Sequence, residues 1–226
     1  MSTERIVFSF SLYGDNPKYT WGCLENAKII QRRFPSALMF VYTAASVPVD
    51  IVEKLTAYAH VRVIPVPVRE GSQGMFDRYL AIDASECDVM FVRDADSRIH
   101  ERDAACIEDF LAAPTKLMQI VRDHFYHRSV VSGGIFALRK AALQDSMASM
   151  IAKSPFHKTN YMADQFFLEN TFYKRLLSHA QIYDRYARFE PRHLLTPFRV
   201  PIIDHLFIGQ VHLFRPDGTE YTEFEA

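Results

Sequence analysis

The sequence of 226 residues contains little cysteine and no long apolar run. Its three cysteines, Cys23, Cys87 and Cys106, are widely spaced and form no Cys-x-x-Cys pair, so we expect reduced thiols in the core rather than a disulfide or a zinc site. No apolar stretch approaches the ~20 residues that cross a bilayer. The first residues also lack the pattern of a secretory signal. These absences predict a cytoplasmic protein without a transmembrane segment.

The sequence also lacks an excess of charge of either sign. There are 26 Lys and Arg residues against 27 Asp and Glu residues, which gives a formal net charge of −1. A general role in binding polyanions has no support from this balance, and we expect no nucleic-acid partner, although a local basic pocket is compatible with it. Hydrophobic residues make up 49% of the chain, enough for the core of a single domain.

Strand-like and helix-like segments alternate through the first two-thirds of the chain. Short apolar or valine-rich runs predict strands at residues 6–10, 38–42, 61–68, 88–93 and 116–121. Helical spacing of apolar residues predicts helices at 17–34, 48–58, 75–82 and 101–111. This alternation predicts an α/β fold with a mostly parallel central sheet flanked by helices, and such sheets bind ligands beyond the carboxyl ends of their strands.

The last third of the chain is less regular. Gly133 and Gly134 interrupt an apolar run, and two further helices are predicted, at 140–153 and 161–177. From His179 onward, prolines at positions 191, 197, 201 and 216 break up any long element. We expect this final stretch to wrap over a binding site rather than to form a separate domain.

The segment Asp94-Ala95-Asp96 follows an apolar strand and is the most informative motif. Residues i and i+2 of an extended chain project to the same side, so Asp94 and Asp96 can converge on one point. Mg²⁺ and Mn²⁺ prefer oxygen ligands and often bind one or two carboxylates together with substrate phosphates. An Asp-x-Asp tripeptide also arises by chance in a solvated loop. The position directly after a buried strand favours a metal site.

In this context the segment resembles the DxD motif of GT-A glycosyltransferases, and three further segments occur in the order typical of that fold. Arg78 resembles an arginine that precedes the DxD strand and lies near the donor. Gly133-Gly134 resembles the glycine-containing strand beneath the donor sugar, and Asp164-Gln165 resembles the Asp-Gln of several retaining families. The whole chain is similar to small glycosyltransferase domains of large DNA viruses and bacteria. The resemblance implies a single GT-A domain, in which residues 1–122 bind the nucleotide and 123–226 the sugar and the acceptor.

The resemblance assigns donor-binding roles in the first half of the chain. Asp94 and Asp96 would hold the metal, and Ala95 between them would lie against the donor. Arg78 would neutralise phosphate, or else pair with a neighbouring acid on the surface. Tyr13 would stack on the base, unless its ring belongs to the core, and Asp15 is a candidate for a contact with the base or ribose.

Further site residues are expected in the second half. Gly133 and Gly134 would let the donor approach, or would form a simple bulge. Asp164, with Gln165 beside it, would bind sugar hydroxyls or face the anomeric carbon; alternatively, Asp164 is an acid favoured by a helix N-terminus.

Three more residues complete the expected site. His124 would contact the sugar or the acceptor. His212 is a candidate third metal ligand, although a lone histidine on an apolar run is more often part of the core or the surface. Asp123, like Asp164, is a candidate general base if the transfer inverts the anomeric centre.

The residues and the resemblance together predict an enzyme, a metal-dependent glycosyltransferase. It would move a sugar from a nucleotide-diphosphate donor, UDP-linked by the resemblance, to a hydroxyl of a glycan acceptor, with retention and with Mn²⁺ or Mg²⁺ as cofactor. One alternative is a non-catalytic domain that binds a nucleotide sugar or a glycan. A DxD phosphatase is a weaker alternative because that family places its nucleophile on the first strand. A sugar-nucleotide pyrophosphorylase is disfavoured because Ser9–Asn16 contains only Gly14 instead of a glycine-rich loop.

Overall fold

A seven-stranded mixed sheet forms the centre of the protein in this computed structural model, which describes residues 4–156 and 160–222. Only β6 runs antiparallel to its neighbours; the other strands are parallel to one another. In spatial order the strands are β3 (Val61–Val66), β2 (Leu38–Ala44), β1 (Ile6–Leu12), β4 (Val89–Arg93), β6 (Ile135–Arg139), β5 (Met118–Arg122) and β7 (Ala180–Asp184). A small hairpin of β8 (His212–Phe214) and β9 (Glu220–Thr222) lies beside α1.

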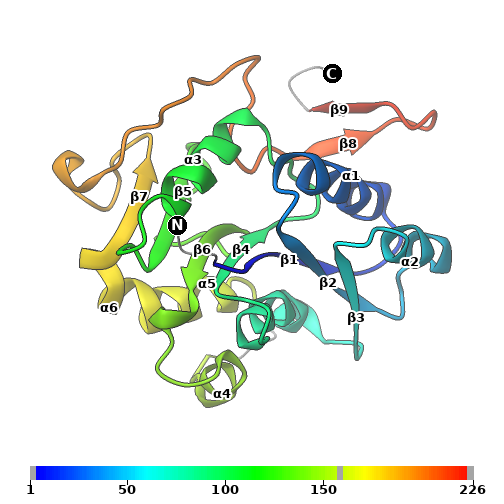
Figure 1. Cartoon of the computed structure of the whole chain (residues 1–226), viewed down its shortest axis with the longest axis horizontal. Helices are drawn as coiled ribbons and strands as arrows, with labels where there is room; N and C mark the ends of the chain where they lie inside the picture. The colour runs from blue at the N-terminus through cyan, green and yellow to red at the C-terminus, as the bar shows by residue number, and fades with distance from the viewer. Residues whose placement is uncertain (1–3, 157–159, 223–226) are drawn as a thin grey trace.

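Helices cover both faces of the sheet (Figure 1). The α-helices are α1 (Pro17–Arg33), α2 (Val49–Thr56), α3 (Glu101–Leu111), α4 (Met147–Lys153), α5 (Ala163–Leu168) and α6 (Lys174–Leu176). Tighter or wider helical turns are η1 (Gly71–Asp83), η2 (Lys140–Ala142), η3 (Glu169–Tyr173), η4 (Leu177–His179) and η5 (Arg192–Leu194). Within the described residues, no helix has the length and apolarity that a membrane crossing needs.

Local sequence explains where the first helix begins and ends. The side chain of Asn16 accepts a hydrogen bond from the backbone N–H of Lys18 at 3.1 Å, and Pro17 occupies the first helical position, so α1 begins there. Arg32 and Arg33 in the last turn match the negative end of the helix dipole. The buried face of α1 packs with α2 and α3 on one side of the sheet, while η1, α4 and α5 cover the other side.

The predicted α/β fold with a mostly parallel sheet is confirmed, and so is the prediction of reduced thiols, because all three cysteines are buried and free. The helix expected at 75–82 lies within η1, a 3-10 rather than an α-helix. The expected helix at 140–153 divides into η2 and α4, and the one at 161–177 divides into α5, η3, α6 and part of η4.

The stretch from His179 onward was expected only to wrap over the site, and this is wrong for its first residues. Ala180–Asp184 forms β7, the edge strand of the central sheet, paired in parallel with β5. All five residues of β7 are buried. The prolines that indicated irregular structure begin only at Pro191, beyond the strand.

Buried arginine–carboxylate pairs hold the carboxyl edge of the sheet together. Arg93 at the end of β4 donates to both oxygens of Asp103 in α3, at 2.7 and 2.8 Å, and both side chains are almost fully buried. Arg93 also donates to the backbone oxygens of Val92 and Phe136. Such a pair adds little stability over an apolar pair of the same shape, but removing one partner leaves a buried charge uncompensated.

We therefore expect Asp103→Asn to lower the free energy of unfolding by about 3–5 kcal/mol, because Arg93 would keep its charge without a counter-ion. Urea denaturation followed by circular dichroism measures this change. The matched control is Asp88→Asn, which removes the carboxylate of a partly exposed pair with Arg5 and should have a much smaller effect. Equal losses in the two variants would contradict the assignment of Arg93–Asp103 as a structural pair.

Candidate active site

A cavity of about 510 Å³ opens at the carboxyl ends of β1 and β4. Asp94, Ala95 and Asp96, which directly follow β4, form one wall. Its other lining residues are Ser11, Tyr13, Tyr19, Met75, Arg78 and Tyr161. The cavity lies where ligands bind in parallel α/β sheets, at the edge formed by strand carboxyl ends. The sequence analysis expects a binding site at this same Asp-x-Asp motif.

Arg78 connects two carboxylates at the base of this cavity. Its Nη1 donates to Asp94 Oδ1 at 2.5 Å, and its Nη2 lies 3.7 Å from Asp164 Oδ2. The side chain of Arg78 is almost fully buried, and its Nε has no hydrogen-bond partner among the described residues. Burial alone would lower the pKa of Arg78, but the charges of Asp94 and Asp164 raise it above its ordinary value. Arg78 is therefore a permanent buried cation and not a surface partner of Asp77 or Glu70.

Asp96 carries a second, weaker ion pair. Its Oδ2 lies 3.7 Å from the ammonium group of Lys18, in the first turn of α1. Burial and the neighbouring charge of Asp94 raise the pKa of Asp96, and Lys18 opposes this effect. The carboxylates of Asp94 and Asp96 therefore repel each other in a partly buried site. A divalent cation between them would relieve this repulsion.

Glycine is required at positions 133 and 134, because the carboxylates of Asp164 and Asp94 lie directly against their backbone. A Cβ atom at Gly134 would overlap the carboxylate of Asp94, and one at Gly133 would overlap that of Asp164. The hydroxyl of Tyr79 donates either to Gly133 O or to Asp164 Oδ2, each at 3.2 Å. The two glycines therefore lie directly against Asp94 and Asp164, and their approach to a donor stays a prediction.

Two of the expected nucleotide contacts lie on the loop after β1. Tyr13 lines the cavity, and its hydroxyl is within donating distance of Gly74 O (2.6 Å) and Asp77 Oδ2 (2.9 Å). Its ring packs against Gly74, so one face is used within the protein. Asp15 is exposed and does not line the cavity.

The expected Asp-Gln pair lies on α5. Asp164 is buried against Arg78 and Tyr79, whereas Gln165 is half-buried.

The segment after β5 places Asp123 away from the cavity. Asp123 is completely buried, and both of its oxygens accept hydrogen bonds from Arg102, at 2.7 and 2.8 Å. Oδ2 also accepts from the backbone N–H of Ile208 at 3.0 Å. The role of general base considered for Asp123 does not fit this geometry, because neither oxygen is free to take a proton from an acceptor. His124, half-buried, stacks on Phe207 with ring centroids 3.9 Å apart and does not line the cavity.

His212 lies next to the Asp-x-Asp segment in the structure. Its backbone N–H donates to Asp96 O at 2.8 Å, but its Nδ1 lies 3.1 Å from a carboxylate oxygen of Glu220 on β9. In the part of the chain that the structure describes, no three His, Cys, Asp or Glu side chains are grouped closely enough to hold a metal ion. The Nε2 of His212 is buried and has no hydrogen-bond partner among the described residues. Because a metal-bound histidine commonly donates its other ring nitrogen to a carboxylate, the contact with Glu220 is compatible with metal binding, and the role of His212 as a third ligand stays a prediction.

Asp94 and Asp96 still fit a Mg²⁺ or Mn²⁺ ion. Both are hard oxygen donors, the side chain of Asp94 is 45% exposed, and the mutual repulsion of the pair is only partly compensated by Lys18. Such ions are commonly held by one or two carboxylates while phosphates and water supply the remaining ligands. The cavity beside the pair has room for a phosphate-bearing ligand.

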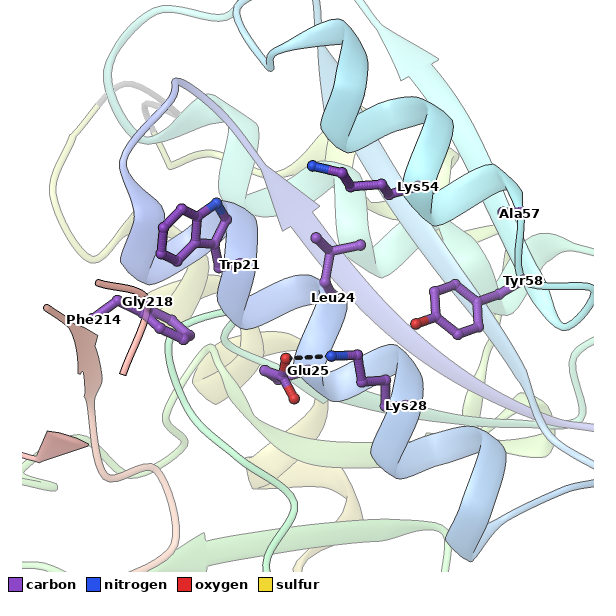
Figure 2. Close-up of a pocket in the computed structure, with 9 residues that line it drawn as sticks. All are labelled: Trp21, Leu24, Glu25, Lys28, Lys54, Ala57, Tyr58, Phe214 and Gly218. Atoms are coloured by element: carbon purple, nitrogen blue, oxygen red, sulfur yellow. Dashed lines mark hydrogen bonds and ion pairs between the residues drawn. The ribbon is translucent and has the colours of Figure 1, made fainter. Parts of the chain in front are cut away.

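A second cavity, of about 500 Å³, lies between α1, α2 and the β8–β9 hairpin. Figure 2 shows that Trp21, Leu24, Tyr58 and Phe214 give it a mainly apolar lining. Its two lysines are already paired, Lys28 with Glu25 and Lys54 with Asp50. Because it offers no free charged group and no carboxylate pair, this cavity is not the candidate active site.

Sequence analysis missed several residues of the site. Lys18 was hidden in the pattern of α1, yet a lysine in the first turn is unfavourable for the helix dipole and could have signalled a partner there. Tyr79, Tyr19 and Tyr161 were not singled out either. Tyr161 is 85% exposed at the cavity, and exposed aromatic residues of this kind often serve binding. No signal in the sequence places Tyr79 against Asp164, because that contact joins η1 to α5.

No protein-family model matches the sequence, and no curated protein sequence matches it. The fold, in contrast, is shared with solved glycosyltransferases. Glucosyl-3-phosphoglycerate synthase from Mycobacterium tuberculosis, solved with Mn²⁺, UDP-glucose and phosphoglyceric acid, has a TM-score of 0.53 and 15% identity over 98% of this chain and 87% of that chain.

Two other glycosyltransferase-fold structures give similar values. The mannosyltransferase PcManGT from Pyrobaculum calidifontis, solved with GDP-Man and Mn²⁺, has a TM-score of 0.51 and 15% identity over 88% of this chain and 57% of that chain. S. aureus TarS has a TM-score of 0.53 and 12% identity, over 80% and 58% of the two chains. The predicted GT-A fold is confirmed by these likenesses, which at such low identity concern the fold alone.

The hydrogen bonds of His127 lead to a prediction for acid stability. Its Nδ1 accepts from the backbone N–H groups of Asp123 and His124, at 3.0 and 3.3 Å, which only an unprotonated nitrogen can do. Burial and the neighbouring His124 lower the pKa of His127 to about 4, whereas an unfolded histidine has a pKa of about 6.5. The folded state therefore favours the neutral ring, and this contribution to stability is lost as the pH falls from about 6.5 to about 4.

We expect His127→Asn, whose amide oxygen can replace Nδ1 as acceptor but does not titrate, to remove this part of the acid sensitivity. Between pH 6.5 and 4 the free energy of unfolding should fall by about 3 kcal/mol less in the variant than in the wild type. Urea unfolding at a series of pH values measures the difference. The control variant is His193→Asn, which replaces an exposed histidine and should leave the pH dependence of the free energy of unfolding unchanged. Parallel profiles for His127→Asn and the wild type would refute this account.

Proposed function

We propose that the protein is a glycosyltransferase that moves a sugar from a nucleotide-diphosphate donor, UDP-linked, to a hydroxyl of a glycan acceptor, with Mn²⁺ or Mg²⁺ as cofactor. The observation that carries this proposal is the carboxylate pair Asp94–Asp96 at the end of β4, facing a cavity of about 510 Å³. The GT-A fold gives it a context, because two proteins with this fold were solved with Mn²⁺ and with UDP-glucose or GDP-Man.

The donor would bind with its diphosphate beside the two carboxylates and its base toward the loop after β1. Asp94 and Asp96 would hold the metal ion, which, when bound, supplies the positive charge that neutralises the departing diphosphate. Tyr13 and Tyr19 line the side of the cavity toward β1 and α1, and they are the candidates for contacts with the base and ribose. Asp15, exposed on the same loop, could reach the ribose only at the rim.

Arg78 and Lys18 would exchange partners when the donor binds. In the structure they neutralise Asp94 and Asp96, at 2.5 and 3.7 Å. Once the carboxylates hold a metal ion, both cations can turn part of their charge toward phosphate oxygens, which arginine and lysine bind well. Arg78 lines the cavity and Lys18 lies 3.7 Å from Asp96 on its wall, so both cations are close to the position expected of the diphosphate.

The sugar would lie beside Asp94 and Asp164, whose carboxylates occupy the space that side chains at Gly134 and Gly133 would fill. Asp164 is held by Arg78 and Tyr79 on one side, and its carboxylate would orient sugar hydroxyls or face the anomeric carbon. Transfer breaks the bond between the anomeric carbon and the diphosphate oxygen and forms one to the acceptor oxygen. The acceptor proton passes to the leaving phosphate, so transfer with retention needs no dedicated general base, consistent with the enclosed position of Asp123.

Binding of UDP with and without metal tests the donor site. In calorimetry, we expect UDP to bind the wild type in Mn²⁺ and to lose at least about tenfold in affinity when the metal is chelated. Asp96→Asn, which keeps the shape of the side chain, should lower the affinity in Mn²⁺ by a similar factor and abolish the response to the chelator. The matched control is Asp50→Asn, which removes an exposed carboxylate on α2 and should bind UDP like the wild type.

The remaining outcomes are also decisive. If GDP or dTDP binds in place of UDP, the donor class holds and the UDP assignment is wrong. Failure of all three nucleotides to bind in the presence of metal would overturn the proposal. Metal-dependent binding without release of UDP from any UDP-sugar, across a set of glycan acceptors, would instead identify a non-catalytic nucleotide-sugar binder.

Lys18→Met should change metal and nucleotide binding in opposite directions. Without nucleotide, removal of the cation 3.7 Å from Asp96 should raise the affinity for Mn²⁺, because Lys18 and the metal ion compete for one carboxylate. With metal present, the loss of a phosphate partner should lower the affinity for UDP, by about tenfold. Titration with Mn²⁺ alone and then with UDP measures the two effects. A decrease in both affinities would show that Lys18 only supports the local structure.

A further inference from the structure

The loops after β5 (residues 123–134) and after β7 (residues 185–191) carry exposed arginines for which the described residues provide no carboxylate partner. We call the side chains of Arg128, Arg185 and Arg188 the arginine patch; all three are exposed. Among the described residues, no carboxylate lies within ion-pair distance of any of them, whereas most other arginines of the chain are paired. Arginines that are left unpaired at a surface are available to an external anion.

The acidic residues of the same two loops are all turned inward. Asp184 is buried, accepts from Arg122 at 2.8 Å, and also accepts from the backbone N–H groups of the three residues Tyr186, Ala187 and Arg188. Glu190 is buried between Arg122 and the hydroxyl of Tyr173. Asp123 is enclosed by Arg102, as described above. Every charged side chain that these loops expose is therefore an arginine.

Exposed aromatic rings accompany the patch. Tyr126 is 68% exposed, Phe125 is 41% exposed, and the centroids of their rings are 4.0 Å apart. On the other loop, the guanidinium of Arg188 lies over the ring of Tyr186, with Cζ 5.2 Å from its centroid. Aromatic rings offer apolar faces to a ligand, and a guanidinium stacked on a ring is held in position without losing its hydrogen-bond donors.

The patch belongs to the same edge of the sheet as the candidate active site. Arg122 pairs with Asp184 in the parallel register of β5 and β7, so the two loops begin side by side. They emerge in the same direction as the loop after β4, which carries Asp94. Charges from both regions act on His127. Burial has the largest effect and lowers its pKa, the charge of Asp94 raises this pKa, and the charge of Arg188 lowers it.

We propose that the acceptor is anionic: a hydroxyl-bearing sugar or polyol that carries a carboxylate or a phosphate, bound by Arg185 and Arg188, which share the ring of Tyr186, with Arg128 on the neighbouring loop. This inference rests on the proposed function and specifies its acceptor. The donor cavity lies at β1 and β4, and the patch lies on the β5 and β7 side of the same edge. An acceptor held by the patch would therefore approach the donor from the side opposite to the nucleotide.

A small anionic group fits this patch better than a membrane surface does. Segments that bind anionic lipids usually gather about 4–8 basic residues, whereas the patch has three, distributed over two loops. Paired guanidinium groups instead match the geometry of a single carboxylate or phosphate. The exposed rings of Phe125 and Tyr126 would then contact the apolar face of the sugar that carries this group.

The test uses immobilised glycans in pairs that differ only in a carboxylate or a phosphate, for example oligogalacturonate and its methyl ester, and mannose 6-phosphate and mannose. Binding of the purified protein is measured in Mn²⁺ and UDP. We expect at least about tenfold tighter binding to the acidic member of one class of pair, and a loss of this preference in Arg185→Gln/Arg188→Gln. The class of pair that responds distinguishes carboxylate from phosphate.

The charge-matched control is Arg32→Gln/Lys54→Gln, which removes two exposed cations near the C-terminal ends of α1 and α2 and should keep the preference. If UDP binds with metal but no pair shows a preference for the acidic member, the acceptor inference is wrong and the donor site stands. If UDP does not bind, the proposed function itself fails. Binding to phosphatidylglycerol vesicles that is lost in the patch variant, without any preference among the glycans, would assign the patch to a membrane and overturn the inference.

Discussion

The buried guanidinium of Arg78 is the constraint on which the candidate site depends. It reaches Asp94 on the loop after β4 and Asp164 on α5, so one side chain joins three separate parts of the chain. A buried arginine cannot lose its charge and must be compensated by carboxylates close by. Gly133 and Gly134 are then required, because any side chain at either position would displace the carboxylates from it. The shape of the cavity therefore follows from the neutralisation of one cation.

Much of the first half of the fold could be predicted from the sequence, because its elements have clear local signals. The period of apolar residues, the Asn16-Pro17 start of α1 and the apolar run before Asp94 each depend on neighbours in the chain, and the structure contains α1 and β4 within a few residues of their expected bounds. The Asp-x-Asp pair could be placed at the sheet edge for the same reason, since a strand fixes where the following residue emerges.

The rest could not be predicted, because it depends on contacts between distant segments. The residues of β7 show no strong strand pattern of their own, and it is pairing with β5 and burial on both faces that make them a strand. Asp123 looked like an available base, but Arg102, 21 residues earlier on α3, encloses it. His212 was expected as a metal ligand, and only the fold shows that its Nδ1 pairs with Glu220 on β9. In each case the partner decides the role, and local sequence does not identify the partner.

The distribution of charge divides the carboxyl edge of the sheet into two regions. On the side of β1 and β4, two carboxylates face the cavity and the nearby cations Arg78 and Lys18 are bound to them. In residues 123–134 and 184–191, which follow or end β5 and β7, the carboxylates are buried and the exposed charges are arginines. In the proposed function, the first region would attract the metal ion and the second an anionic group. Carboxylates repel an anionic group unless a metal ion is bound to them, so in the proposed function the diphosphate would enter the first region together with the metal ion. The two regions would then hold the donor and the acceptor at separate places along one edge, which is what transfer between them requires.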